Sequence, residues 1–495
     1  MTKNKQYWQK LAGGLVIEDR AFIDGEYVSA INGESEKVVN PANGVLLAEV
    51  TSCGPADADL AIKAARRAFN SGIWADMAPA ERKRVILAWA DLMAKHADEL
   101  AILETLDVGK PISNTTAVDI PSAIATIRWN GEAIDKVYGE IAPTPAKTLG
   151  LVTRLPLGVV TAIVPWNFPL STTAWKIAPA LASGNSVILK PAANTPLTAI
   201  RIAGLAAAAG IPDGVFQVLP GPGSSLGQYL ARHDGIDGIT FTGSTPVGKL
   251  LMEYSAQSNL KRTFLELGGK GPNIVLADAD IEKAAEMAAT AVFYNSGQTC
   301  TAGTRLIVDN QILDEFLERV IYHSQSWSPG DPLDPDTTMG PLIDHRQYQT
   351  VNQYITQGIA EGAQLALGYE QVLEESGGHY HGPTIFSNVT NNMSIAREEI
   401  FGPVLSVIGF NDIEEAVTIA NDSIFGLAGA VWSRNINSAL SVAEKIRVGT
   451  MGVNNYFGGD ITVPFGGFKQ SGNGRDKSLH AFADYTELKT TWIEY

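Results

Sequence analysis

Apolar residues recur every three or four positions between residues 55 and 130. This spacing gathers the apolar side chains on one face of a helix, and it predicts helices over residues 56–69 and 81–106. An amphipathic helix buries its apolar face against another element. The two helices are therefore expected to cover a second structural layer.

That layer begins near residue 158, where short runs of β-branched residues replace the helical pattern. The runs VVTAIVPWN, NSVILKPA, VFQVLPG and GITFTGS each end in Gly, Pro, Asn or Ser, and helical stretches over residues 173–182, 197–209 and 227–233 separate them. Strands that alternate with helices at this spacing form a parallel sheet. Ligands are then expected at the carboxyl ends of the strands.

A second α/β series follows Glu266. Its expected strands are PNIVLAD, TRLIVD, VLSVIGF and LAGAVWS, and its expected helices span residues 281–295, 312–324 and 413–421. A chain of 495 residues is long enough for more than one lobe. The sequence therefore predicts an α/β protein with a Rossmann-type cofactor-binding domain and an α/β catalytic domain, over residues 1–137 with 156–266, and 267–468.

Two segments belong to neither series. Residues 138–155 alternate about a proline-rich turn and have the character of a hairpin, and residues 482–495 alternate like an edge strand. We interpret both as oligomerisation strands. A terminal strand packed within one subunit is the alternative for the second segment.

Composition narrows the class of protein. The formal net charge of −16 disfavours nonspecific binding to nucleic acids and to anionic membranes. The N-terminus is polar and no run of about 18 apolar residues occurs, so we expect a cytoplasmic enzyme that acts on a small molecule. With only two cysteines, the chain has no disulfide framework and no multi-cysteine metal site, and no metal is expected.

Cys300 is the candidate nucleophile. It lies in SGQTCTAG, between a helical stretch and a strand, with Gly297 and Gly303 on either side. A side chain at such a loop tip can be held against a substrate, although an isolated cysteine is more often a small buried hydrophobe. Cys53 has no reactive neighbour in the sequence, and we interpret it as structural.

Two further side chains suit chemistry at a thiol. Glu266 follows an apolar strand and precedes Gly268 and Gly269, so its carboxylate can face a cleft while the backbone makes room for a ligand. Asn167 in PWNFP lies between two prolines, and a rigid amide can donate to a developing oxyanion. A solvated glutamate and a turn-capping asparagine are the alternatives.

Several strand ends carry groups suited to a dinucleotide. Gly223 belongs to LPGPGSSLG, which is one residue longer than the G-x-G-x-x-G fingerprint. Gly243 and Ser244 lead into a helix whose amide groups can meet a pyrophosphate. A cation, a carboxylate and an aromatic ring follow other strands and loops, at Lys190, Glu399 and Phe401.

The motifs PWNFP, ILKPA, FTGSTPVG, LELGGK, GQTC, EEIFGPV and PFGGFKQSGNGR occur in this order along the chain. Together they resemble the aldehyde dehydrogenase superfamily over nearly the whole length. The resemblance implies that Cys300 is the nucleophile, Glu266 the general base and Asn167 the oxyanion donor. It implies cofactor contacts from Trp166, Lys190, Gly243, Ser244, Glu399 and Phe401.

The same resemblance implies NAD or NADP as the cofactor, a homo-oligomer that is a dimer or a tetramer, and oxidation of an aldehyde through a thioester. Relatives that pass the acyl group to coenzyme A generally lack the glutamate, so Glu266 favours hydrolysis. The family commonly carries a glutamate at the position of Ala193, where it repels a 2′-phosphate. Because that repulsive element is missing, we expect NADP to be tolerated.

The opening and the ending of the chain resemble the branch that includes γ-glutamyl-γ-aminobutyraldehyde dehydrogenase, so an aminoaldehyde is the expected substrate. A broad-range, aromatic or indole-type aldehyde is the alternative. Asp119 and Asp460 are candidates to meet a cationic or amide-bearing aldehyde, or are solvated. The candidate substrate contacts, for which packing between lobes is the alternative, are Phe168, Thr172, Trp175, Phe457 and Phe465.

Two other classes of protein remain for comparison. A papain-type cysteine hydrolase needs a histidine base, and none of the seven histidines lies in a recognisable motif. A non-catalytic cofactor-binding protein on the same fold is disfavoured because Cys300, Glu266 and Asn167 are all present.

Overall fold

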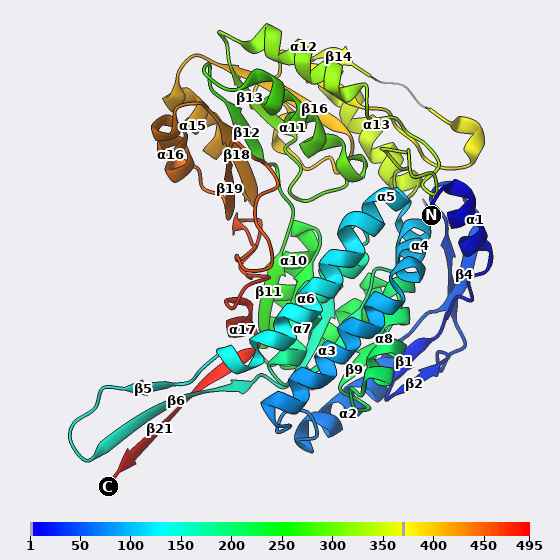
Figure 1. The fold of residues 1–495 in the computed structure, drawn as a ribbon, viewed down its shortest axis with the longest axis vertical. Coiled ribbons are helices and arrows are strands. Elements are labelled where there is room, and N and C mark those ends of the chain that lie inside the picture. The colour runs from blue at the N-terminus through cyan, green and yellow to red at the C-terminus, as the bar shows by residue number, and fades with distance from the viewer. Residues whose placement is uncertain (1–2, 369–371) are drawn as a thin grey trace.

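Two lobes and a protruding arm make up the chain (Figure 1). The computed structural model describes residues 3–368 and 372–495. Each lobe is built on a seven-stranded sheet, and the arm is a separate three-stranded sheet. The α/β class predicted from the alternation of patterns is confirmed.

The first sheet contains the strands predicted from the β-branched runs. Its five strands from β11 to β9 are parallel, as expected, and β1 and β2 extend the edge in the antiparallel sense. Both are three residues long and lie outside the alternation of strands and helices that reveals the other strands, which is why these two escape sequence analysis. In spatial order the strands are β11 (Arg262–Glu266), β10 (Gly238–Thr242), β7 (Val159–Ile163), β8 (Ser186–Lys190), β9 (Phe216–Val218), β1 (Ala21–Ile23) and β2 (Glu26–Val28).

Helices pack against this sheet. The predicted helix over residues 81–106 is two helices, because the backbone of His96 leaves the helical region between them. The helix expected at residues 173–182 begins earlier, at Pro169, since proline is favoured in the first helical turn. The helices of this lobe are α1 (Lys5–Gly13), α2 (Pro55–Asn70), α3 (Pro79–Lys95), α4 (Ala97–Val108), α5 (Ile112–Asn114), α6 (Ile120–Ala133), α7 (Pro169–Ala182), α8 (Leu197–Ala209), α9 (Gln228–Arg232) and α10 (Thr245–Ala256).

The second lobe repeats the plan. In spatial order its strands are β14 (Gln364–Leu367), β15 (Thr384–Ser387), β16 (Val404–Phe410), β13 (Arg305–Asp309), β12 (Pro272–Val275), β18 (Ala428–Trp432) and β19 (Thr450–Val453). Its helices, with a last one that follows the lobe, are α11 (Ile281–Phe293), α12 (Leu313–Ser324), α13 (His345–Ala360), α14 (Ser394–Arg397), α15 (Ile413–Asn421), α16 (Ile436–Lys445) and α17 (Ala481–Asp484). The chain passes from the first sheet to the second between β11 and β12. The exact limits of the two domains stay predictions.

The arm consists of β5 (Glu140–Ala142), β6 (Thr148–Pro156) and β21 (Thr486–Glu494). The C-terminal strand pairs antiparallel with β6 over its whole length, so the hairpin and the terminal strand lie in one sheet of the same chain. Two small antiparallel sheets complete the fold: β3 (Ser35–Val39) with β4 (Leu46–Thr51), and β17 (Phe425–Gly426) with β20 (Phe468–Lys469).

Strand order places the ligand crevice of the first sheet. The chain runs outward from β7 through β8 to β9, and then crosses back to β10 and β11 on the other side of β7. Ligands of doubly wound sheets bind at this reversal, outside the carboxyl ends of the strands. Asn167 follows β7, Ser244 follows β10, and Glu266 ends β11.

None of the helices in residues 3–368 and 372–495 is long and apolar enough to cross a membrane. The same residues contain no group of three or more His, Cys, Asp or Glu side chains placed to hold a metal ion.

Candidate active site

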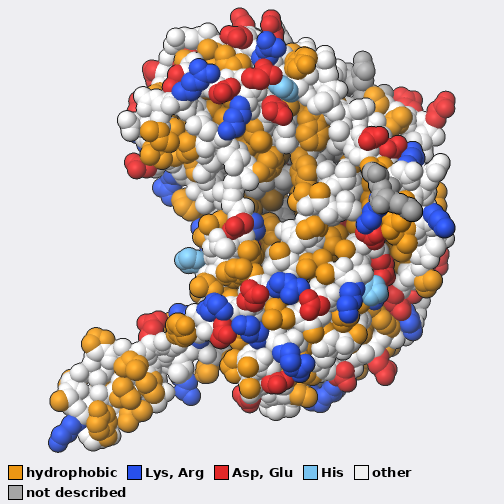
Figure 2. All heavy atoms as spheres, viewed as in Figure 1, with side chains coloured by type: hydrophobic (Ala, Val, Ile, Leu, Met, Phe, Trp, Pro, Cys, Tyr) orange, Lys and Arg blue, Asp and Glu red, His pale blue; other side chains and the backbone are white. Residues whose placement is uncertain are grey.

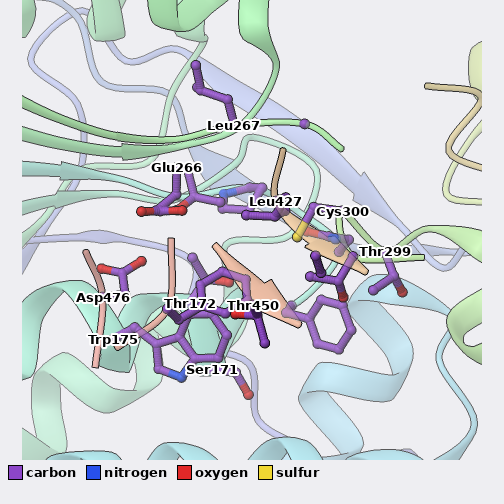
Figure 3. A pocket seen from close by; sticks show the side chains of 18 of the residues that line it. Ser171, Thr172, Trp175, Glu266, Leu267, Thr299, Cys300, Leu427, Thr450 and Asp476 are labelled. Atoms are coloured by element: carbon purple, nitrogen blue, oxygen red, sulfur yellow. The ribbon is translucent and has the colours of Figure 1, made fainter. Parts of the chain in front are cut away.

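A cavity of about 720 Å³ lies where the carboxyl ends of the first sheet face the second lobe. Figure 3 shows the Glu266 carboxylate and the Cys300 sulfur on one side of it, with Thr172 and Trp175 on the other. The residues predicted for catalysis and for the substrate all line this cavity: Asn167, Phe168, Thr172, Trp175, Glu266, Cys300, Phe457 and Phe465.

The Cys300 loop is held by a tight turn after α11. Asn295, Ser296 and Gly297 have φ values of 52°, 55° and 74°, in the left-handed region that favours glycine. A Cβ on Gly297 would collide with the carbonyl group of Gly402. The Ser296 hydroxyl donates to the carbonyl of Gly340 at 2.8 Å. These contacts fix the path of the chain that carries Cys300 to the cavity wall.

The Cys300 thiol is protonated at neutral pH in this arrangement. Burial raises its pKa to about 12, and the nearby carboxylates of Glu399 and Glu266 add to the shift. The main-chain N–H groups of Cys300 and Thr301 act in the opposite direction, since they stabilise the thiolate. The same groups are placed to stabilise another anion beside the sulfur.

The Glu266 carboxylate ends β11 inside the cavity. Both of its oxygens are buried and accept no hydrogen bond from a described residue. Burial raises its pKa well above the ordinary value, the charge of Asp476 adds to this, and the cations of Lys176 and Arg475 oppose it. A carboxylate with a raised pKa can take up a proton from water near neutral pH.

An ion pair missed by sequence analysis lies behind Glu266. The Lys176 ammonium donates to the Asp476 carboxylate at 2.8 Å, and both side chains are buried. Asp476 directly follows the motif PFGGFKQSGNGR, and Lys176 directly follows Trp175, so proximity to predicted residues is the signal that was available.

Asn167 keeps one donor free. Its side chain is 4% exposed, and its Nδ2 donates to the carbonyl of Gln298 at 2.9 Å. A primary amide has two N–H groups, so the second remains for a ligand. The Asn295 amide, which was not predicted, donates to the carbonyls of Asn167 and Gln298 and ties this segment to the Cys300 loop.

The features around α10 fit a dinucleotide phosphate. Gly243 and Ser244 line the cavity at the start of this helix, and the Ser244 side chain does not cap it, so the first-turn amide groups are free of a side-chain partner. The Thr242 hydroxyl beside them is buried and has no hydrogen-bond partner among the described residues. A helix N-terminus of this kind attracts anions.

Glu399 and Phe401 form the opposite wall. Glu399 accepts a hydrogen bond from the main-chain N–H of Gly269 at 3.0 Å, and burial raises its pKa to about 7. Phe401 packs edge-to-face on Trp166, with ring centroids 5.3 Å apart. The Gln347 amide, another residue missed by sequence analysis, donates to the carbonyl of Phe401 at 2.8 Å and holds this loop.

Two predicted cofactor residues lie outside the cavity lining. Lys190 is buried at the end of β8, where its ammonium donates to the carbonyl of Pro191 at 2.9 Å. Burial lowers its pKa to about 8. Gly223 begins a π-helical turn, Gly223–Gly227, and a Cβ there would meet open space. Its role in cofactor binding stays a prediction.

The two acidic candidates for substrate contact do not line the cavity. Asp119 is fully buried and accepts a hydrogen bond from Lys110 at 2.7 Å. Asp460 is exposed and accepts hydrogen bonds from the main chain and hydroxyl of Thr462. Each carboxylate has a partner within the protein, and the second oxygen of Asp119 is buried with no hydrogen-bond partner among the described residues. Contact of either residue with a substrate stays a prediction.

Fold and site together define a class: two-lobed α/β enzymes with a dinucleotide-type crevice facing a cysteine. The model of the aldehyde dehydrogenase family matches residues 27–491, and the chain belongs to that family. It is therefore an aldehyde dehydrogenase, as its motifs predicted.

Similar proteins cover nearly the whole chain. "NADP/NAD-dependent aldehyde dehydrogenase PuuC" of Escherichia coli (strain K12) is 52% identical over 98% of both chains. The crystal structure of a γ-glutamyl-γ-aminobutyraldehyde dehydrogenase from Burkholderia cenocepacia J2315 is 55% identical, covers 99% of both chains and has a TM-score of 0.98. An indole-3-acetaldehyde dehydrogenase complexed with NAD+ is 55% identical, covers 99% of this chain and all of the other, and has a TM-score of 0.99. These similarities confirm the predicted fold and the predicted resemblance to the branch that includes γ-glutamyl-γ-aminobutyraldehyde dehydrogenase.

Proposed function

We propose that the protein oxidises an aldehyde to a carboxylic acid through a thioester on Cys300, with NAD or NADP as the oxidant. One observation supports this most strongly: Cys300, Glu266 and Asn167 line the same cavity, beside the free N-terminus of α10. The sum of the reaction is aldehyde, water and oxidised cofactor to acid, reduced cofactor and a proton.

The chain's own groups account for the covalent steps. The Cys300 thiol loses its proton to solvent, and the sulfur adds to the aldehyde carbon. The free N–H of Asn167 and the main-chain N–H of Cys300 stabilise the oxyanion that forms. A bound nicotinamide supplies the acceptor for the hydride that leaves this carbon, and a thioester remains. Glu266 then takes a proton from water, which hydrolyses the thioester.

Both cofactors are expected to serve. The relative PuuC carries NADP and NAD in its name, and the indole-3-acetaldehyde dehydrogenase is a complex with NAD+. Ala193 presents no carboxylate to repel a 2′-phosphate, and Lys190 lies at the end of the neighbouring strand. We expect kcat/KM for NADP to lie within about tenfold of that for NAD, because the charge repulsion is absent.

An aminoaldehyde such as γ-glutamyl-γ-aminobutyraldehyde is the proposed substrate, since two of the relatives above belong to that branch. Indole-3-acetaldehyde is the second candidate, because a relative of equal identity acts on it by name. The test is to assay both aldehydes and a set of simple aliphatic aldehydes with each cofactor, and to rank the aldehydes by kcat/KM. The aminoaldehyde should rank first.

The protein is proposed to act in the cytoplasm as a homo-oligomer, a dimer or a tetramer. The protruding arm supports the oligomer, because three strands with few contacts to their own lobe gain apolar contacts only from another subunit (Figure 1).

Replacing Cys300 by alanine tests the mechanism. Aldehyde-dependent formation of reduced cofactor should fall below detection, while the dissociation constant for NAD, measured by quenching of tryptophan fluorescence, should change less than about threefold. Cys53→Ala is the matched control, because that thiol is buried away from the cavity. Full activity of Cys300→Ala, or loss of activity in Cys53→Ala with an unchanged fold, would contradict the proposal.

A further inference from the structure

A lysine that the proposed mechanism does not use forms part of the cavity wall. Lys477 is the only cationic side chain among the described residues that line the cavity. Its backbone has φ of 64°, and its ammonium nitrogen lies 4.5 Å from the ring centroid of Trp175 and 5.5 Å from that of Phe465. The cation thus sits over the two aromatic rings predicted for substrate contact.

The charge of Lys477 has no direct partner. No described residue accepts a hydrogen bond from its ammonium, and none forms an ion pair with it. Its neighbour Asp476 is committed to Lys176, and Asp460 accepts from Thr462. Both carboxylates act on Lys477 only through space, while burial lowers its pKa. A half-buried ammonium without a partner is costly unless a ligand supplies one.

Other unpartnered polar atoms of the cavity are donors as well. The indole N–H of Trp175 and the hydroxyls of Tyr294 and Thr299 line the cavity, are buried, and have no hydrogen-bond partner among the described residues. An indole nitrogen can only donate, and a hydroxyl can always donate one hydrogen. Apart from the Glu266 carboxylate, the unpartnered groups of the cavity therefore match a ligand rich in acceptor oxygens.

The same arrangement disfavours a cationic tail at this point. Faces of Trp and Phe are the usual binding surface for an ammonium group. Here Lys477 already covers Trp175 and Phe465, and a second cation would be repelled by the first. An aldehyde whose far end is a free ammonium would gain nothing from these rings.

We propose that Lys477 binds a carboxylate at the far end of the substrate, and that aldehydes with a terminal carboxylate are the preferred substrate class. The inference rests on the proposed oxidation at Cys300 and deepens it. γ-Glutamyl-γ-aminobutyraldehyde carries such a carboxylate at its far end, on the same carbon as an ammonium that has to face away from Lys477. Its amide carbonyl can accept from the unpartnered donors.

The test compares each acid with its neutral form in three proteins. A series of ω-oxo carboxylates of increasing length and their methyl esters is assayed at saturating NAD with the wild type, Lys477→Met and Lys477→Arg. The wild type should prefer the acid at the length that reaches Lys477. The ratio of kcat/KM for acid over ester should fall about 10- to 100-fold in Lys477→Met, because a hydrogen bond to a charged group is lost, and recover in Lys477→Arg.

Each outcome has a defined meaning. An equal loss for acid and ester in Lys477→Met would show a structural role and overturn the inference, as would a wild type without preference for any acid. If Lys477→Met does not fold, the acid-to-ester ratio of the wild type should still decrease with ionic strength, because salt screens the attraction; an unchanged ratio overturns the inference.

Failure of the proposed substrate is distinguishable from failure of this inference. If γ-glutamyl-γ-aminobutyraldehyde is a poor substrate but ω-oxo carboxylates are strongly preferred, the proposed substrate is rejected and the role of Lys477 is supported. If the wild type turns that aldehyde over efficiently and Lys477→Met has the same kcat/KM for it, the proposed substrate is supported and the role of Lys477 is rejected.

Discussion

At the scale of the residue, the burial that destabilises the charged form of Glu266 also makes its carboxylate a better base. A carboxylate with two buried and unpartnered oxygens is destabilising in its charged form, so the pKa rises. The same rise gives the group affinity for a proton near neutral pH. The pair formed by Lys176 and Asp476 lies beside it, where one charge raises the pKa and the other lowers it.

Glu266→Gln should separate the two halves of the reaction. Removing the base should slow steady-state turnover by about 10²- to 10⁴-fold, the usual contribution of general base catalysis. The hydride step does not need this carboxylate in the proposed mechanism. A rapid burst of reduced cofactor, close to one equivalent per active site, should therefore persist in stopped-flow absorbance.

The control for Glu266→Gln is the thiol variant, which should give neither burst nor turnover. Absence of a burst in Glu266→Gln together with normal turnover would count against the base assigned here. Absence of both would place Glu266 before hydride transfer.

The residues proposed for catalysis are also those that the sequence indicates most directly. Cys300, Glu266 and Asn167 each lie inside a short motif whose neighbours are adjacent in the chain, so local residues carry the signal. The partner of Lys176 is 300 positions away, and no local pattern indicates it. Lys477 was missed for the same reason, since its importance depends on Trp175 lying beneath it.

At the scale of the element, the turn at residues 295–297 decides where the Cys300 loop points. Its consecutive left-handed residues end the helical path of α11, which is why the helix expected to reach residue 295 stops at Phe293. The helical periodicity continues past that point in the sequence. Packing of the turn on Gly340 and Gly402 overrides it.

Gly297→Ala should therefore impair folding and activity together. A Cβ at this position adds the strain of φ 74° to a collision with the backbone of Gly402. Strained backbone of this kind costs on the order of 1–3 kcal/mol, and the collision adds to it. Thermal unfolding should show a decrease of several degrees in Tm, with kcat reduced because Cys300 is displaced.

Gly362→Ala is the matched control, because that glycine has φ of 98° and nothing within reach of a Cβ. It should cost only the backbone strain and leave kcat unchanged. Equal decreases in Tm for the two variants would show that the collision at Gly402 is relieved at no cost.

At the scale of the whole molecule, the arm is the part that the chain does not bury. Apolar side chains gather on its surface (Figure 2), and the exposed ones on β21 are Leu488, Trp492 and Ile493. A soluble monomer rarely exposes such a surface. The arm also lies away from the cavity, so association and catalysis can be tested separately (Figure 1).

Trp492→Glu should reduce the size of the assembly. A charge in an apolar interface costs several kcal/mol when it is left unpaired, which is enough to shift an oligomer toward smaller species at micromolar concentration. Light scattering after size-exclusion chromatography should report the lower mass. Lys489→Glu, on the same strand, is the control for a change of charge alone. An unchanged mass for Trp492→Glu would reject the arm as the interface.

By itself, the sequence determined the α/β class, the order of its elements and the residues that end its strands, because periodicity and motifs are properties of neighbouring residues. Only the tertiary structure decided which side chains meet in the cavity. It placed Asp119 and Asp460 outside the cavity lining, joined Lys176 to Asp476, and set Lys477 over Trp175. These contacts depend on how two sheets pack against each other, and no local pattern in the chain records that packing.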